Sequence, residues 1–308
     1  ATRRSVLNLD VNSMYRLPSR PAAFLGFVLL TLLLFRNPLQ TLVSLAWNDE
    51  RYTYLLAVPL LSAGMIVLKR GRIFAMTEWS LKAGVVPALL SVAAWLAAAT
   101  WAARIGAVEG LSLYGAAVAL AWSGGFGFCF GLAAVRAAAF PLAFLLLMAP
   151  MPELLMHKAE VALQHGSADV TQALMKLTGM TFFREGLTFA LPGFNIEVAR
   201  ECSGIRSSTV FWITAAAASY LFLKSSWSRL ALIILTVPIL IFKNAVRITT
   251  LSWLGVNVTQ DVLHGDLHRQ GGVPFGLIAI VLLIPAVVGL RRLEDWTGRR
   301  ISITAAPK

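Results

Sequence analysis

Charged residues are scarce in this chain. Only 14% of its 308 residues are Asp, Glu, Lys or Arg, 57% are hydrophobic, and the mean hydropathy is +0.72. A soluble domain contains about 25% charged residues. This composition excludes an ordinary water-soluble fold and makes the bilayer the expected solvent. We therefore expect a single integral membrane domain over residues 1–308, not two soluble domains.

Cysteine is also rare, with Cys129 and Cys202 as its two instances. Two cysteines make no disulfide framework, and the sequence has neither a Cys-x-x-Cys pair nor a His-Glu-x-x-His motif. A structural zinc site and a zinc protease are therefore not expected, and nothing in the sequence calls for a cofactor. Cys129 lies in an apolar run, where a free thiol behaves as a small hydrophobic side chain. Cys202 lies among polar and charged residues instead.

Acidic residues are fewer than basic ones, and the formal net charge is +12. The basic residues lie in short segments between apolar runs, which is the pattern of a membrane topology signal. No block of Lys and Arg alternates with aromatic residues, so a nucleic-acid partner is not expected. The expected surroundings are membrane lipids.

Apolar runs long enough to cross a bilayer dominate the chain. A transmembrane helix needs roughly 17–25 mostly apolar residues, and the sequence predicts an all-α, polytopic bundle of about eight such helices. The predicted spans are residues 21–36, 53–68, 84–103, 111–134, 137–150, 204–223, 229–254 and 272–290. The short fifth span is the least typical. The spans at 84–103 and 111–134 are rich in Ala and Gly, which favours close helix packing in lipid.

The distribution of Lys and Arg orients this bundle. With the N-terminus and the basic tail 1–20 in the cytoplasm, the inner segments carry 16 Lys and Arg residues and the outer segments carry 8. Cytoplasmic loops are enriched in these residues. The sequence therefore predicts a multi-pass protein of the cell inner membrane with both termini inside.

The longest segment between spans, residues 151–203, falls on the outer side of this topology. Its first part has apolar residues at three- and four-residue steps from Leu155 to Leu177, which predicts an amphipathic helix on the membrane surface. Residues 181–198 then alternate around turns at Gly186 and Gly193, which is typical of a short hairpin. This extracytoplasmic loop leads directly to Cys202.

The first group of chemically capable residues is Glu201-Cys202-Ser203-Gly204-Ile205-Arg206-Ser207-Ser208, at the start of the sixth span. A thiol at a helix N-terminus is favoured as a thiolate, and a nearby cation lowers its pKa further. Arg206 lies four residues after Cys202, so it shares a helix face with it. The plainer interpretation is a polar helix cap with an inert cysteine.

The second group is Lys243-Asn244-Ala245-Val246-Arg247 in the seventh span. Asn244 and Arg247 are three residues apart and share a helix face. Ionisable residues inside a span suggest function by default. The alternative is that their side chains extend to the interface, as Lys243 would do.

The third group precedes the eighth span and contains His264 and His268, four residues apart, with Asp261 and Asp266 beside them. A metal site is conceivable from this spacing, but Gly265 weakens a helix here. The other interpretation makes one histidine an acid/base partner of Cys202. All three groups fall on the outer side of the predicted topology. A thiol, an arginine and a histidine on one face suggest a nucleophile, an anion stabiliser and a proton carrier.

These motifs together resemble the exosortase/archaeosortase family. The resemblance rests, over roughly residues 140–285, on Met148-Ala149-Pro150-Met151-Pro152, Glu201-Cys202-Ser203-Gly204-Ile205-Arg206-Ser207, Asn244-Ala245-Val246-Arg247-Ile248 and His268-Arg269-Gln270-Gly271-Gly272, in that order. The resemblance implies a catalytic set of Cys202, Arg247 and His268. The histidine, in place of the archaeal arginine, implies the bacterial exosortase branch. Ser203, Gly204, Arg206 and Asn244 are expected to support the site or bind substrate.

The same resemblance implies a membrane-embedded cysteine peptidase or transpeptidase, a thiol protease by class. Its expected partners are exported proteins with a C-terminal tripartite sorting signal: a Pro-Glu-Pro-like motif, a transmembrane helix and a basic tail. The alternative from another class is a non-enzymatic transporter or exopolysaccharide-export component, whose ionisable residues would line a path through the bilayer.

Overall fold

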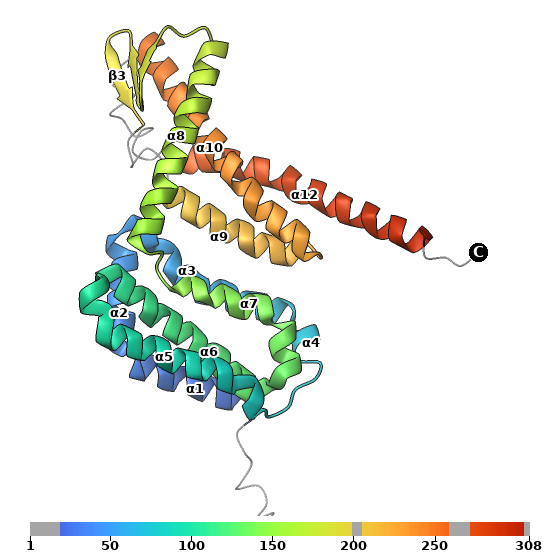
Figure 1. Cartoon of the computed structure of the whole chain (residues 1–308). Helices are drawn as coiled ribbons and strands as arrows, with labels where there is room; N and C mark the ends of the chain where they lie inside the picture. The colour runs from blue at the N-terminus through green and yellow to red at the C-terminus, as the bar shows by residue number, and fades with distance from the viewer. Residues whose placement is uncertain (1–18, 199–204, 259–271, 305–308) are drawn as a thin grey trace, which may run out of the picture.

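The computed structural model describes residues 19–198, 205–258 and 272–304 (Figure 1). The α-helices are α1 (Arg20–Leu34), α2 (Arg36–Asn48), α3 (Ala57–Leu68), α4 (Arg70–Ile73), α5 (Leu81–Ile105), α6 (Ala107–Ala137), α7 (Ala139–Phe144), α8 (Glu153–Leu177), α9 (Ile205–Phe222), α10 (Ser226–Asn257) and α12 (Gly272–Thr304). Two short 3-10 helices, η2 (Glu50–Leu56) and η3 (Leu145–Met148), and three strands, β1 (Phe183–Glu185), β2 (Thr188–Leu191) and β3 (Phe194–Glu197), complete the described chain.

The predicted all-α, polytopic membrane bundle is confirmed. Among the described residues, five helices are long and apolar enough to cross a bilayer, and the number rises to seven if each of two bent helix pairs is one span. The bent pairs are α1 with α2, at 80°, and α7–η3 with α8, at 96°. The predicted count of eight stays a prediction, because it also needs the short apolar helix α9 as a span.

Close packing of α5 against α6 follows from their glycines. A Cβ atom added to Gly127 would lie 2.5 Å from the carbonyl oxygen of Ala83, and one added to Gly84 would lie 2.5 Å from that of Gly124. Neither neighbour is a flexible side chain, so only glycine permits this approach of the two backbones. The Ala- and Gly-rich composition of the two spans therefore has the packing role that the sequence predicts.

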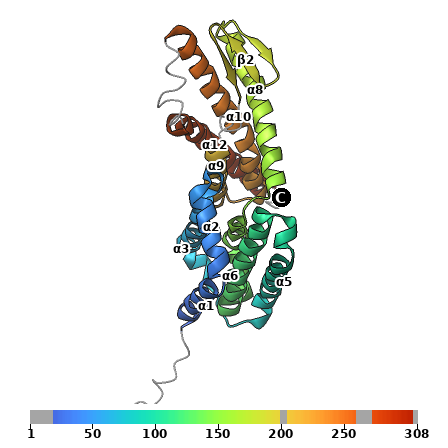
Figure 2. The same ribbon diagram turned by 90° about the vertical axis from the view of Figure 1, so that its left-hand side faces the viewer.

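The segment between α7 and α9 leaves the direction of the spans. The 96° bend turns α8 across the helices that precede it, and the sheet lies at the far end of α8 from the N-terminal helices (Figures 1 and 2). The predicted hairpin has three antiparallel strands in the order β1-β2-β3. Gly186 and Gly193, with φ of 61° and 92°, each supply a turn that other residues rarely adopt, so the chain reverses twice.

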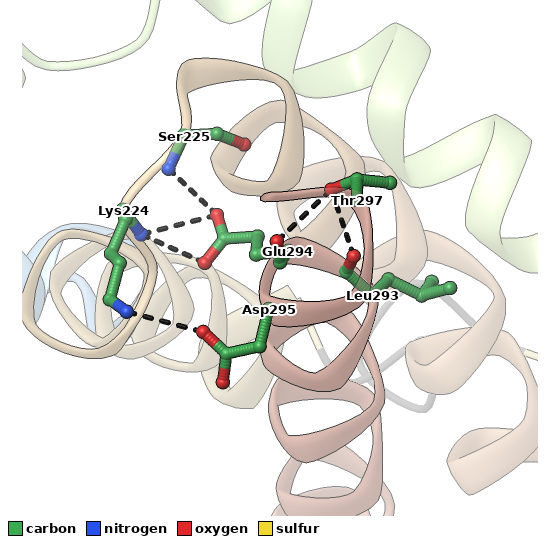
Figure 3. Close-up of polar contacts among 6 residues, drawn as sticks. All are labelled: Lys224, Ser225, Leu293, Glu294, Asp295 and Thr297. Atoms are coloured by element: carbon green, nitrogen blue, oxygen red, sulfur yellow. Dashed lines mark hydrogen bonds and ion pairs between the residues drawn. The ribbon is translucent and has the colours of Figure 1, made fainter. Parts of the chain in front are cut away.

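A polar contact fixes α12 to the turn between α9 and α10 (Figure 3). The Glu294 carboxylate accepts hydrogen bonds from the backbone N–H groups of Lys224, at 3.1 Å, and Ser225, at 2.7 Å. Asp295 forms an ion pair with the Lys224 ammonium at 3.2 Å. Ser225 also caps α10, so Glu294 lies where unpaired N–H groups and the helix dipole favour an anion.

Candidate functional site

Helices α9 and α10 bring the first two motifs to one level of the bundle. They are joined by the turn at residues 223–225 and run in opposite directions. At 1.5 Å per residue, Ile205 lies about 26 Å from this turn along α9, and Lys243 lies about 26 Å from it along α10. The described start of α9 is therefore level with the turn of α10 that carries Asn244 and Arg247.

Helix α12 brings its own end to the same level. Glu294 holds α12 beside the turn between α9 and α10. Gly272 lies about 33 Å back along α12, and Arg247 lies about 32 Å along α10 from Ser226. The described start of α12 therefore also reaches the level of Arg247. The start of α9, the turn of α10 that carries Arg247 and the start of α12 therefore lie at about the same level along the three helices. These positions adjoin or contain three motifs that are far apart in sequence.

The structure describes the predicted site residues only in part. Cys202, Ser203, Gly204 and His268 lie outside the described residues, as does His264. Arg206 belongs to the first turn of α9, with only its backbone described. Asn244 and Arg247 are described, and both lie on α10. The roles assigned to all of these residues stay predictions.

Asn244 is the most deeply buried of the predicted residues that the structure describes. Its side chain is 1% exposed, and its amide nitrogen donates to the Ser167 hydroxyl of α8 at 3.1 Å. Its amide oxygen has no hydrogen-bond partner among the described residues. A buried amide oxygen that accepts no hydrogen bond is costly to keep, so this oxygen marks a position where a further donor is expected.

Comparison with known proteins now places the chain in a family. Residues 46–285 match the family model of transmembrane exosortases. The chain belongs to this family. The match begins well before residue 140, so it includes the second to fourth predicted spans that hydropathy alone had identified. No curated protein and no solved structure matches the chain.

Lys243 of this exosortase is placed differently from the prediction. Its side chain is 3% exposed, so the ammonium does not extend to the membrane interface as proposed from the sequence. It lies one turn before Arg247, which is half-buried. A buried charge needs polar partners, and both side chains do make polar or electrostatic contacts. This turn of α10 is thus a buried cationic region beside Asn244.

The face of α8 that packs inside the protein combines apolar residues with a row of polar ones, and the sequence analysis did not predict the polar row. Four polar residues with three- and four-residue spacing are buried there: Glu160, Gln164, Ser167 and Thr171. The apolar residues that define the predicted amphipathic helix include Leu155 and Leu177, which are exposed on the opposite side. The regular polar spacing was the available signal. It was overlooked because apolar residues are normally assumed to face the core.

Gln164 holds the chain that leads to the cysteine motif. Its side-chain amide donates to the Val198 carbonyl at 3.0 Å, while the Val198 N–H donates to the Leu187 carbonyl at 3.0 Å. Val198 is fully buried and packs in one apolar cluster with Ile248, the neighbour of Arg247. The last described residue before the cysteine motif is therefore anchored against the turn of α10 that carries the second motif.

The other cysteine has the setting predicted for it. Cys129 is buried in the apolar core of the N-terminal helices, near Phe126 and Phe130. This core includes residues of α3, α6 and α7 and extends to Ile213 and Ala217 of α9, but it contains no residue of α10 or α12. Cys129 therefore serves as a matched control for any experiment on Cys202.

Proposed function

We propose that this exosortase is a membrane-embedded cysteine peptidase or transpeptidase that cleaves the C-terminal sorting signal of exported proteins. The observation that carries the proposal is that the start of α9, the turn of α10 that carries Arg247 and the start of α12 lie at about the same level of the bundle. Each of these positions adjoins or contains one of the three motifs with the proposed nucleophile, anion stabiliser and proton carrier. Membership of the exosortase family supports the same assignment.

The proposed reaction begins at Cys202. The thiolate attacks the carbonyl carbon of the scissile peptide bond and forms a tetrahedral oxyanion. The Arg247 guanidinium stabilises this negative charge, because a preorganised cation acts strongly at a site that excludes water. The C–N bond then breaks, and His268 transfers a proton to the departing amine. The products of this half-reaction are a thioester on Cys202 and the released C-terminal segment.

The second half-reaction resolves the thioester. His268, now neutral, accepts a proton from water or from an amine as that acceptor attacks the thioester carbonyl. The new C–O or C–N bond forms, the C–S bond breaks, and the cysteine is regenerated. Asn244, Arg206, Ser203 and Gly204 are proposed to position these groups or the substrate. The buried polar face of α8 supports this arrangement through Ser167 and Gln164.

The proposed substrate signal combines a Pro-Glu-Pro-like motif, a transmembrane helix and a basic tail. The proposed location is the cell inner membrane, with both termini in the cytoplasm and the site on the periplasmic face. The distribution of charge supports this orientation. Lys224, Arg229, Arg291 and Arg292 gather at the end of the bundle opposite the site, and cytoplasmic ends are enriched in such residues.

A transporter is less well supported by the same helices. A path for a polar solute would need ionisable residues spread through the membrane depth. On α10, Arg229 lies near one end, and no Asp, Glu, Lys, Arg or His occurs between it and Lys243. Residues 207–222 of α9 and 272–290 of α12 also have none. The ionisable groups of these three helices are thus absent from the apolar stretches 207–222, 230–242 and 272–290 and lie on either side of them, as an enzyme with a site at one level of the bundle requires.

Co-expression with a protein that has such a C-terminal signal tests the proposal. Wild-type enzyme is expected to shorten the co-expressed protein, and Cys202→Ala is expected to leave it uncut at equal expression. Cys129→Ala is the matched control and should process at the wild-type rate, because Cys129 lies in the apolar core. Processing by Cys202→Ala at the wild-type rate would exclude the peptidase mechanism.

A further inference from the structure

A deep apolar groove lies among α1, α3, α6 and α7, away from the proposed active site. Its volume is about 690 Å³, and its walls include Phe24, Val28, Ile66, Phe126 and Leu145. The polar side chains in its lining are confined to a few positions. Ser62 already donates to the Pro141 carbonyl at 2.9 Å, and the Trp122 indole donates to Thr31 at 2.7 Å. The interior of the groove therefore presents hydrocarbon to whatever fills it.

The depth of the groove matches one leaflet of a bilayer. Its lining extends from Arg20 to Val28 on α1, from Pro59 to Val67 on α3 and from Trp122 to Phe130 on α6. Each stretch rises eight residues, which corresponds to about 12 Å. Half of the hydrocarbon core of a bilayer is about 15 Å thick. All three helices thus outline a groove that runs from one membrane interface to near the midplane.

Arg20, the one basic residue in the groove lining, stands at the interfacial end. Its Nη1 donates to the carbonyl oxygen and the hydroxyl of Thr77, at 2.5 Å and 2.6 Å. These bonds hold the guanidinium at the groove mouth and use one of its three nitrogens. A guanidinium has five N–H donors in a planar fork that suits phosphate. The remaining nitrogens are the ones available to an anion at the mouth.

Further basic residues lie on the segment that leads to this mouth. Lys69, Arg70 and Arg72 are exposed and precede Phe74 and Thr77, which line the groove. Glu78 is the single acidic residue in the segment from 69 to 82. Clusters of Lys and Arg next to a membrane span attract anionic lipids. These residues attract anionic lipids to this end of the bundle, while Arg20 is the basic residue of the groove lining that can select a headgroup within it.

The volume of the groove suits a lipid acyl chain as its occupant and is too small for a transmembrane helix. A 20-residue helix about 10 Å in diameter occupies roughly 2,400 Å³, more than three times the volume of the groove. A site of a few hundred cubic ångströms fits a flexible chain or another small ligand. Residues 1–18 of the chain carry Arg3, Arg4 and Arg16 against one Asp10, so their charge is the wrong sign to lie against Arg20.

We propose that this groove binds one anionic phospholipid, with an acyl chain between α1 and α3 and the phosphate on Arg20. Lipid tails gain little by leaving other lipid tails. Selectivity therefore comes from the headgroup, and the groove fixes the lipid's position. This inference does not depend on the proposed peptidase chemistry.

Native mass spectrometry of the purified full-length chain tests the site. The protein in detergent is offered equal amounts of phosphatidylglycerol and phosphatidylcholine with the same acyl chains. We expect about fivefold preferential retention of phosphatidylglycerol, which corresponds to the ~1 kcal/mol that one Lys or Arg contributes near an anionic surface. Arg20→Gln should abolish the preference, whereas Arg20→Lys should retain it because the charge remains. Arg70→Gln removes a positive charge at the same end of the bundle but outside the groove lining, so this control should keep the preference.

Two further variants place the lipid. Ala63→Phe fills the groove and should reduce retention of both lipids while the helices stay folded. Brominated acyl chains on phosphatidylglycerol should quench a fluorescence component that Trp122→Phe removes, because Trp122 lines the groove. Equal retention of the two lipids by the wild type would overturn the proposal. The proposal would also be overturned if Arg70→Gln lost the preference for phosphatidylglycerol as completely as Arg20→Gln, or if Arg20→Lys lost it.

Discussion

Replacement of Gln164 by Met tests whether α8 positions the cysteine motif. Methionine is close to glutamine in length but cannot donate a hydrogen bond. The substitution removes the bond from the Gln164 amide to the Val198 carbonyl, which measures 3.0 Å. Val198 is fully buried, so water cannot replace the lost donor. The change therefore acts on the last described residue before the cysteine motif.

The size of the effect follows from that burial. A buried carbonyl that loses its partner costs about 1–3 kcal/mol. That cost favours local opening of the sheet end over opening of the whole bundle, because the apolar packing of the helices is unchanged. Each 1.4 kcal/mol corresponds to roughly a tenfold change in an equilibrium population. We expect processing of a co-expressed substrate to fall at least about fivefold, with a smaller change in thermal unfolding.

Gln172→Met is the matched control on the same helix. Gln172 accepts from Arg184 of β1 at 2.6 Å, but this contact is only half-buried, and Arg184 also pairs with Asp169 at 2.8 Å. Exposed contacts of this kind contribute about 0–1 kcal/mol. The control should therefore process substrate at close to the wild-type rate. Equal rates for Gln164→Met and the wild type would refute the positioning role of α8.

Three further predictions concern the site and the bundle. Arg247→Lys should lose most processing activity in the co-expression assay, because an ammonium cannot replace a planar guanidinium. His268→Ala should be strongly impaired and His264→Ala should retain substantial activity in the same assay; an equal loss in both would favour a shared metal site instead. Gly127→Ala should lower the free energy of unfolding in detergent by about 1–3 kcal/mol, because a backbone oxygen lies 2.5 Å from the new Cβ. Gly64→Ala should leave the free energy of unfolding unchanged, because no atom lies within 4 Å of a Cβ added at Gly64.

Hydropathy and glycine content predicted the membrane bundle because these features act locally. Twenty apolar residues must span a bilayer whatever follows them, and glycines at 84 and 127 allow close packing of α5 and α6. The bends were not predicted. The 96° turn into α8 falls at residues 149–152, which include Pro150 and Pro152, and the angle of such a turn is a tertiary property.

The residues of α8 that contact the site region were harder to predict than the motifs themselves. Arg247 and Asn244 stood out because polar groups are rare inside a span. Gln164 and Ser167 did not, because polar residues in an extracytoplasmic helix are ordinary. Only the packing of α8 against α10 shows that they are buried and bonded to the site region. Lys243 was misplaced for the same reason, since burial is decided by the neighbouring helix.

The most direct test of the account is to detect the acyl-enzyme. The purified exosortase is mixed with a peptide that carries a C-terminal sorting signal, quenched with acid to preserve thioesters, and examined by intact-mass and peptide-level mass spectrometry. The account predicts an adduct with the mass of the N-terminal product on Cys202, lost on treatment with hydroxylamine and absent from Cys202→Ala. The Cys129→Ala variant should form it normally. Cleavage of the peptide by Cys202→Ala at the wild-type rate, with no adduct in either protein, would contradict the account.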